Sequence, residues 1–177
     1  MRMVALLKGI NVGGNRKVPM AELREVATAC GLAEVSTYIQ SGNLVFSASD
    51  AAEHVDRALE ASIEERFGFK VDVLVRTSEQ WRQLLSACPF ISAAEDRPNL
   101  LHLCLSKLTP HPDAVSLLSG ICAPNEAVAL VGDALWVDYA EGVARSKVTL
   151  AKLDKAVGSM VTARNFRTVQ HLGERLS

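Results

Sequence analysis

The order in which two hydrophobic periodicities alternate constrains the fold of this chain more than any other feature of its sequence. Strands repeat every second residue, whereas helices repeat about every 3.6 residues. In the first 76 residues these patterns predict strand, helix, strand, strand, helix and strand, over Met3–Ile10, Pro19–Cys30, Val35–Gln40, Asn43–Ser47, Asp50–Phe67 and Lys70–Arg76. This β-α-β-β-α-β order is that of the ferredoxin-like unit, in which right-handed crossovers place both helices on one face of a four-stranded antiparallel sheet.

Turn and capping residues support these boundaries. Gly31 and Gly68 stand where a left-handed residue would end each helix. Asp50, three residues before Glu53, predicts a capping pair for the second helix. Ser41-Gly42 separates two β-rich runs and indicates a hairpin.

A third helix leads into the second half of the chain. Thr77 or Ser78 is expected to cap it, and Pro89 is expected to end it. The stretch that follows is poor in periodicity, and we interpret it as irregular. The predicted organisation is therefore a ferredoxin-like subdomain with its linking helix at 1–88, a linker at 89–99 and a second subdomain at 100–177.

The second subdomain also mixes strands and helices. The patterns predict two strands joined by the two-residue turn Gly132-Asp133, preceded by one strand and one helix and followed by two helices. The ranges are Leu100–Lys107 (strand), Pro112–Ile121 (helix), Ala127–Val131 and Ala134–Tyr139 (strands), and helices after Ser146 and after Arg164. The fold class predicted is thus α+β, a βαββαβ subdomain followed by a small βαββαα subdomain.

Composition excludes several classes of protein. Nineteen basic residues balance twenty acidic ones, so no overall field holds the chain on nucleic acid or an anionic membrane. The four cysteines are unevenly spaced and lack a C-x-x-C pair, which favours a reducing compartment over a disulfide framework. No apolar run is long enough for a membrane span or a signal peptide. We expect a cytoplasmic protein without membrane contact.

Loops rich in glycine, asparagine and basic residues are the candidate binding elements. In the loop 8–17, glycines let backbone N–H groups turn toward an anion, and the following helix N-terminus adds positive potential. We include the turn 40–43 only because it could lie close to the loop 8–17. Its residues are good turn formers whatever the function. The candidate ligand-binding residues of these two segments are Lys8, Asn11, Gly13, Gly14, Lys17, Gln40, Ser41 and Asn43.

Two further candidates come from the starts of the last two predicted helices. Ser146 is expected to cap one helix, with Arg145 and Lys147 presenting cations at its start. Arg164 and Asn165 repeat this theme at the final helix. Helix stability alone favours acids in a first turn, so these cations serve an anion or project into water.

Three segments that contain candidate residues of these loops resemble a known family. They are Leu6–Gly14 (LLKGINVGG), Thr37–Phe46 (TYIQSGNLVF) and Arg164–Val169 (RNFRTV), with Arg145-Ser146-Lys147 as a fourth match. In this order they resemble the hallmarks of the bacterial domain-of-unknown-function 1697 family, over essentially the whole chain. The resemblance implies two α+β subdomains, the first ferredoxin-like, and no catalytic assignment. The sequence departs from the family pattern at Lys8, where arginine is expected, and at Phe166 and Arg167, where tryptophan and asparagine are expected.

Enzyme and metal signatures are absent from the sequence. It contains no G-x-S-x-G, H-E-x-x-H, P-loop or C-x-x-C motif. His102 and Cys104 share a face of a predicted strand, but no second pair with ligand spacing follows, so we interpret them as packing residues and expect no metal and no cofactor.

Three hypotheses follow. The first is binding of a phosphate-bearing ligand, a nucleotide or nucleic acid, at the Gly/Asn/basic loops. The second is an enzyme with an unrecognised site in the same loops, which no motif identifies or excludes. The third is a protein-interaction or homo-oligomeric module, because a sheet covered by helices on one face leaves the other face for a partner.

Overall fold

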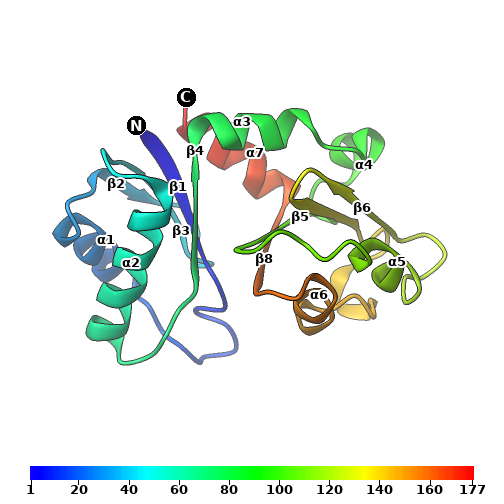
Figure 1. The fold of residues 1–177 in the computed structure, drawn as a ribbon, viewed down its shortest axis with the longest axis horizontal. Helices are drawn as coiled ribbons and strands as arrows, with labels where there is room; N and C mark the ends of the chain where they lie inside the picture. Colours follow the sequence, from blue (N-terminus) through cyan, green and yellow to red (C-terminus); the bar gives the residue numbers. More distant parts are fainter. The chain divides into compact units, whose positions relative to one another are not determined.

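Each half of the chain is built around its own four-stranded sheet, and the chain divides accordingly into two units. A computed structural model describes residues 1–177. The first unit holds Met1–Arg82 together with Leu172–Ser177, and the second holds Gln83–His171. The result is a mixed α+β fold with two four-stranded antiparallel sheets and seven α-helices (Figure 1). None of the helices combines the length and apolar character that crossing a bilayer requires.

The first unit contains one sheet with the strand order β2-β3-β1-β4. Its elements are β1 (Arg2–Leu7), α1 (Met20–Ala29), β2 (Ala33–Thr37), β3 (Asn43–Ser47), α2 (Ala52–Phe67), β4 (Val73–Thr77) and α3 (Ser78–Ser86), the last of which continues into the second unit. The strand and helix order of residues 1–77 is the predicted one, and β3 has the predicted bounds.

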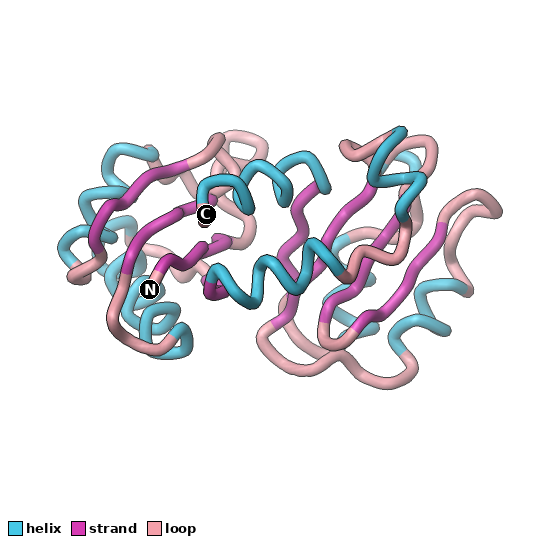
Figure 2. Tube along the Cα trace, turned by 90° about the horizontal axis from the view of Figure 1, so that it is seen from above, coloured by secondary structure: helices cyan, strands magenta, loops and turns pink.

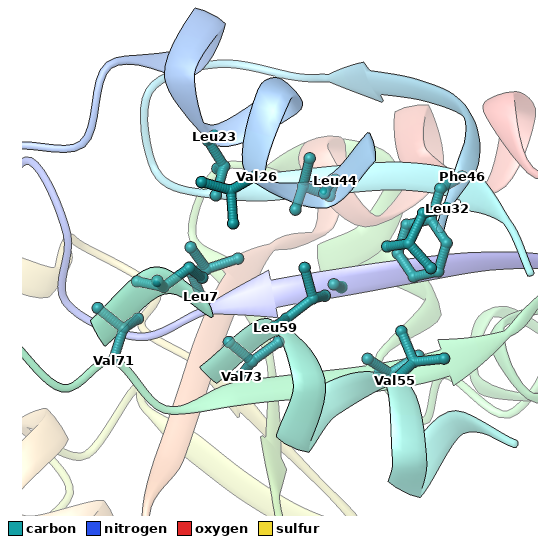
Figure 3. Close-up of a cluster of buried hydrophobic side chains, with 14 of the residues drawn as sticks. Leu7, Leu23, Val26, Leu32, Leu44, Phe46, Val55, Leu59, Val71 and Val73 are labelled. Atoms are coloured by element: carbon teal, nitrogen blue, oxygen red, sulfur yellow. The ribbon is translucent and has the colours of Figure 1, made fainter. Parts of the chain in front are cut away.

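The core of the first unit lies between this sheet and helices α1 and α2. Alternate residues of β1 point to this side, namely Met3, Ala5 and Leu7, and all three are fully buried. Leu23 of α1 and Leu59 of α2 pack against them (Figure 3). Burying each large aliphatic side chain contributes roughly 1.5–3 kcal/mol relative to leaving it exposed.

Side chains on both faces of this sheet are buried. Phe46 on β3 is fully buried in the core, so it is not available to stack a nucleic-acid base. On the other face of the sheet, Val4, Leu6, Val45 and Leu74 are also at most 2% exposed.

Helix ends in the first unit follow the expected chemistry only in part. Gly68 ends α2 in the left-handed conformation, with φ of 78°, as predicted. The expected cap at Asp50 is wrong, because the N-cap is Ala51 and makes no side-chain hydrogen bond. Thr77 and Gln80 cap α3 reciprocally, since each side-chain oxygen accepts from the other residue's N–H.

The last residues of α7 (Phe166–Arg175) belong to the first unit, although the helix begins in the second. Arg175 donates to the carbonyl of Thr37 at 3.3 Å, and its guanidinium lies 5.2 Å from the ring centroid of Tyr38. Arg2 donates to the carbonyl of Arg175 at 3.1 Å. The C-terminal end of α7 thus contacts β1 and β2, which lie far from it in the sequence.

The second unit contains a second four-stranded sheet with the order β6-β7-β5-β8. Its elements are α4 (Ile91–Asp96), β5 (Leu101–Ser106), α5 (Ala114–Ser119), β6 (Ala127–Val131), β7 (Ala134–Asp138), a 3-10 turn at Val143–Arg145, α6 (Leu150–Val157), β8 (Val161–Asn165) and the start of α7. Its core, which includes Cys104, Leu118, Leu135 and Leu153, lies between the sheet and helices α5 and α6. Figure 2 shows helices and strands of both units in a second view.

Two elements of the second unit were missed by the sequence prediction. Residues 161–165, expected to lead directly into a helix, form β8, which pairs antiparallel with β5. Pairing with a strand far along the chain decides this structure, and such pairing leaves no local periodicity. The segment 89–99, expected to be irregular, contains the six-residue α4, which is too short to show a helical period. The observed order of the second half is therefore βαββαβα, and the predicted βαββαα order is wrong.

Replacing Gly42 tests the packing of the hairpin between β2 and β3. Gly42 has φ of 80°, and a Cβ there would meet Leu7 Cβ at 2.7 Å and Ile10 Cδ1 at 2.8 Å. Gly42→Ala combines left-handed strain with overpacking, so we expect it to lower the free energy of unfolding by about 2–4 kcal/mol. Urea unfolding monitored by circular dichroism measures the change.

Gly31→Ala is the matched control for this prediction. Gly31 has a similar φ of 82°, but a Cβ added there would meet nothing within 4 Å. Only the conformational cost applies, so the loss should be about 1 kcal/mol. Equal losses for the two variants would contradict the close packing of Gly42 against Leu7.

Candidate functional site

The loop 8–17 forms a miniature hairpin, which we call the glycine hairpin. Val12 and Asn15 form a β-bridge, and the N–H of Asn15 donates to the carbonyl of Val12 at 3.0 Å. Gly13 and Gly14 occupy the two central positions with φ of 58° and 78°. Left-handed conformations at both central positions are what a type I′ turn requires. The two glycines therefore place their backbone at an exposed tip.

Asn11 fixes the base of the glycine hairpin. Its Oδ1 accepts from the N–H of Val18 at 2.8 Å, while its Nδ2 donates to the carbonyls of Val18 at 3.0 Å and Gln40 at 2.9 Å. Both amide hydrogens and the carbonyl oxygen are thus used within the chain. The side chain of Asn11, a predicted ligand contact, joins the two candidate loops of the first unit.

Cationic and backbone groups attach the same hairpin to the segment before β4. The guanidinium of Arg16 donates to the carbonyl of Lys70 and lies 5.4 Å from the ring centroid of Phe69. The N–H of Lys8 donates to the carbonyl of Asp72 at 2.9 Å. Lys17 is exposed. The glycine hairpin is therefore anchored on two sides, with Lys17 in solvent.

The turn 40–43 is held by Asn43. This residue is fully buried, and its Nδ2 donates to the carbonyl of Tyr38 at 2.9 Å and to Ser41 Oγ at 3.0 Å. Gln40 contributes its carbonyl to Asn11. These contacts show how the turn is built and how it meets the glycine hairpin. The structure thus brings together the eight candidate residues of the first unit as one pair of adjoining loops.

The predicted cap at Ser146 is wrong, because helix α6 begins later than expected. Its N-cap is Thr149, whose side chain accepts from the N–H of Lys152 at 3.3 Å. Ser146 Oγ instead accepts from the N–H of Val148 at 3.0 Å. Arg145 and Lys147 lie in the connection before α6, outside its first turn. Their charges therefore do not stand at the positive end of that helix.

Arg164 is also placed differently from the prediction. It lies on β8 and is only 8% exposed, with its guanidinium donating to Thr162 Oγ1 and to the carbonyl of Ala163, both at 2.9 Å. Burial lowers the pKa of Arg164 to about 10. Asn165, by contrast, does cap the final helix, because its Oδ1 accepts from the N–H of Thr168 at 2.9 Å. Arg164 does not present its charge at an exposed helix start.

The second unit contains an ion pair that the sequence did not predict. Arg97 donates from Nε to Asp138 Oδ1 at 3.1 Å and from Nη2 to Asp138 Oδ2 at 2.5 Å. The neighbouring carboxylate raises the pKa of Arg97. The pair borders a depression of about 350 Å³ that is lined by Pro89, Phe90, Ile91, Ser92, Ala93, Arg97 and Asp138. Arg97 lies in the predicted linker. The only sequence signal for this ion pair was an acidic residue, Asp138, at the end of an apolar strand.

The pair His102 and Cys104 serves packing in this structure. Cys104 lies in the core of the second unit, and the ring of His102 meets that of Tyr139 edge-on at 5.0 Å. Burial lowers the pKa of His102. The hydroxyl of Tyr139 donates to the carbonyl of Val148 at 3.0 Å. No three His, Cys, Asp or Glu side chains are grouped so that they could hold a metal ion.

Comparison with known proteins gives one family and similar solved structures. The model of a family described as protein of unknown function (DUF1697) matches residues 1–136. A solved structure of a conserved bacterial protein, SP0830 from Streptococcus pneumoniae, is similar with a TM-score of 0.77 and 25% sequence identity, covering 99% of this chain and 98% of that chain. No curated protein matches the chain.

Removing the side chain of Asn11 tests its role in holding the two loops. Asn11→Ala loses three hydrogen bonds and places alanine at φ of 54°. We expect the free energy of unfolding to fall by about 2–4 kcal/mol, at ~1 kcal/mol for each hydrogen bond. Chemical denaturation measures the loss. Asn15→Ala in the same hairpin is the control, because its exposed side chain makes no hydrogen bond in the chain. Equal denaturation midpoints for the two variants would contradict the role of Asn11 in joining the two loops.

Thiol reactivity tests the packing role of Cys104. Burial raises the pKa of Cys104 to about 12, so almost none of the reactive thiolate exists at about pH 8. Iodoacetamide labelling followed by mass spectrometry should leave Cys104 unmodified in the native protein and modify it fully in urea. Cys30, which is only half-buried, serves as the internal comparison. Modification of native Cys104 as fast as Cys30 would contradict its burial.

Proposed function

Because the chain belongs to the DUF1697 family, whose description assigns no function, we propose one from the geometry: the protein binds a phosphate-bearing ligand, a nucleotide or nucleic acid, at the glycine hairpin. The observation that carries this proposal is the exposed tip of the hairpin. There the N–H groups of Gly13 and Gly14 have no acceptor within the chain. Lys17 supplies an exposed cation three residues further on.

Preorganisation favours a binding role for this loop. Asn11 and Arg16 fix it on two sides, so little conformational entropy remains to be lost when an anion is bound. Successive backbone N–H groups in a turn form the concave donor sites that bind anions in other proteins. The contacts are made by main-chain groups and one ammonium, so they fit a phosphate of any larger ligand.

The fold itself supports a finer proposal about the first unit. A sheet with the order β2-β3-β1-β4 and connecting helices α1 and α2 has the strand arrangement expected of a ferredoxin-like unit. We propose that description for the first unit. It does not choose a function, because the same arrangement supports many unrelated activities.

Titration of the ¹⁵N-labelled protein tests the binding proposal. Inorganic phosphate, triphosphate, ATP and a short oligonucleotide are added in turn, and amide shifts are followed. We expect shifts at Gly13 and Gly14. For the oligonucleotide, Lys17→Ala should reduce the slope of log affinity against log salt by about 1, as the loss of one phosphate contact predicts.

Lys155→Ala is the matched control, because it removes one exposed cation from the second unit. A second variant, Arg145→Ala/Lys147→Ala, tests whether the cations before α6 take part. The proposal is refuted if wild type shows no shift with any of the four additions, or if Lys17→Ala and Lys155→Ala bind alike.

A further inference from the structure

The four sheet edges of this protein are protected to different degrees. An edge strand exposes unpaired N–H and C=O groups, and natural proteins guard such strands with charges or bulges. Edge β2 carries Glu34 and a register shift, β4 carries Arg76 and β8 carries Arg164. Edge β6 reads Ala-Val-Ala-Leu-Val, with neither a charge nor a register shift.

The register of the β6–β7 hairpin shows which backbone groups of β6 face outward. The two-residue turn Gly132-Asp133 makes Val131 and Ala134 a hydrogen-bonded pair, and such pairs alternate along the ladder. Ala129, opposite Trp136, therefore also points its N–H and C=O toward β7. Val128 and Leu130 point theirs away from the sheet, and no group of the chain pairs with them.

We propose that β6 is a self-association edge, at which two copies of this chain pair their β6 strands antiparallel about a two-fold axis at Ala129. In this register Val128 of one copy faces Leu130 of the other, and the reverse. Each such pair exchanges two hydrogen bonds, so every outward N–H and C=O of Val128 and Leu130 is satisfied. The edge is self-complementary, which is the requirement of a two-fold interface.

The residues around the edge fit a second copy. Ala129 faces Ala129 of the other copy, so the centre of the interface carries no bulk and no charge. Glu126 falls opposite Gly132 of the other copy, and Asp133 falls opposite Asn125, so no acidic residue directly faces another. Each strand is half-buried along its whole length, which leaves apolar surface on both faces for the joined sheet.

Sedimentation velocity of the full chain over a wide concentration range tests the inference. Wild type should associate reversibly to a dimer. Ala129→Lys places two ammonium groups face to face at the axis, and Ala129→Glu does the same with carboxylates, so each should weaken association about tenfold, which corresponds to about 1.4 kcal/mol. An equimolar mixture of the two variants should regain the dimer, because Lys then faces Glu.

The mixture separates a lost interface from a lost fold, since two misfolded variants would not restore each other. Ala33→Lys, on the edge strand β2 of the first unit, is the matched control and should dimerise as wild type does. Amide exchange gives an independent readout: Val128 and Leu130 should exchange more slowly as concentration rises, whereas Ala129 should be slow throughout. A monomeric wild type at all concentrations, a dimer unaffected by Ala129→Lys, or an associating wild type whose variant mixture stays monomeric would each overturn the inference.

Discussion

The pairing of one early strand with two later ones is the constraint on which each unit depends. β1 lies between β3 and β4, and β5 lies between β7 and β8, so neither central strand has a neighbour that is adjacent in sequence. Forming such non-local pairs costs loop-closure entropy, and other interactions must offset this cost. The helical cores on β1 and β5 supply that free energy, since both strands are buried along nearly their whole length.

The same constraint explains what the sequence could and could not predict. Elements with strong local signals were found, including β3, the left-handed end of α2 at Gly68 and the turn at Gly132-Asp133. β8 was missed because its evidence is its partner β5, which is remote in sequence. The late start of α6 was missed because Thr149 competes with Ser146 as a cap, and both are good capping residues.

For the candidate site, sequence located the loops but not the roles of their residues. Asn11 was singled out as a ligand contact, yet its partners are backbone groups of Val18 and Gln40, which no motif reveals. Arg164 was taken as exposed, and only the structure shows that it is buried. The donors that we propose for phosphate binding are the main-chain N–H groups of Gly13 and Gly14. Every residue of this kind has such a group, and only the turn geometry decides where it points.

The sharing of α7 between the two units has a consequence for the order of events during synthesis. Residues 172–177, which hold β2 through Arg175, leave the ribosome only after the whole second unit has been made. A nascent first unit therefore waits with part of its surface uncovered while the second unit folds. Translation speed through residues 83–171 sets the length of that exposure, and chaperone contact with the unfinished first unit would be concentrated in this interval.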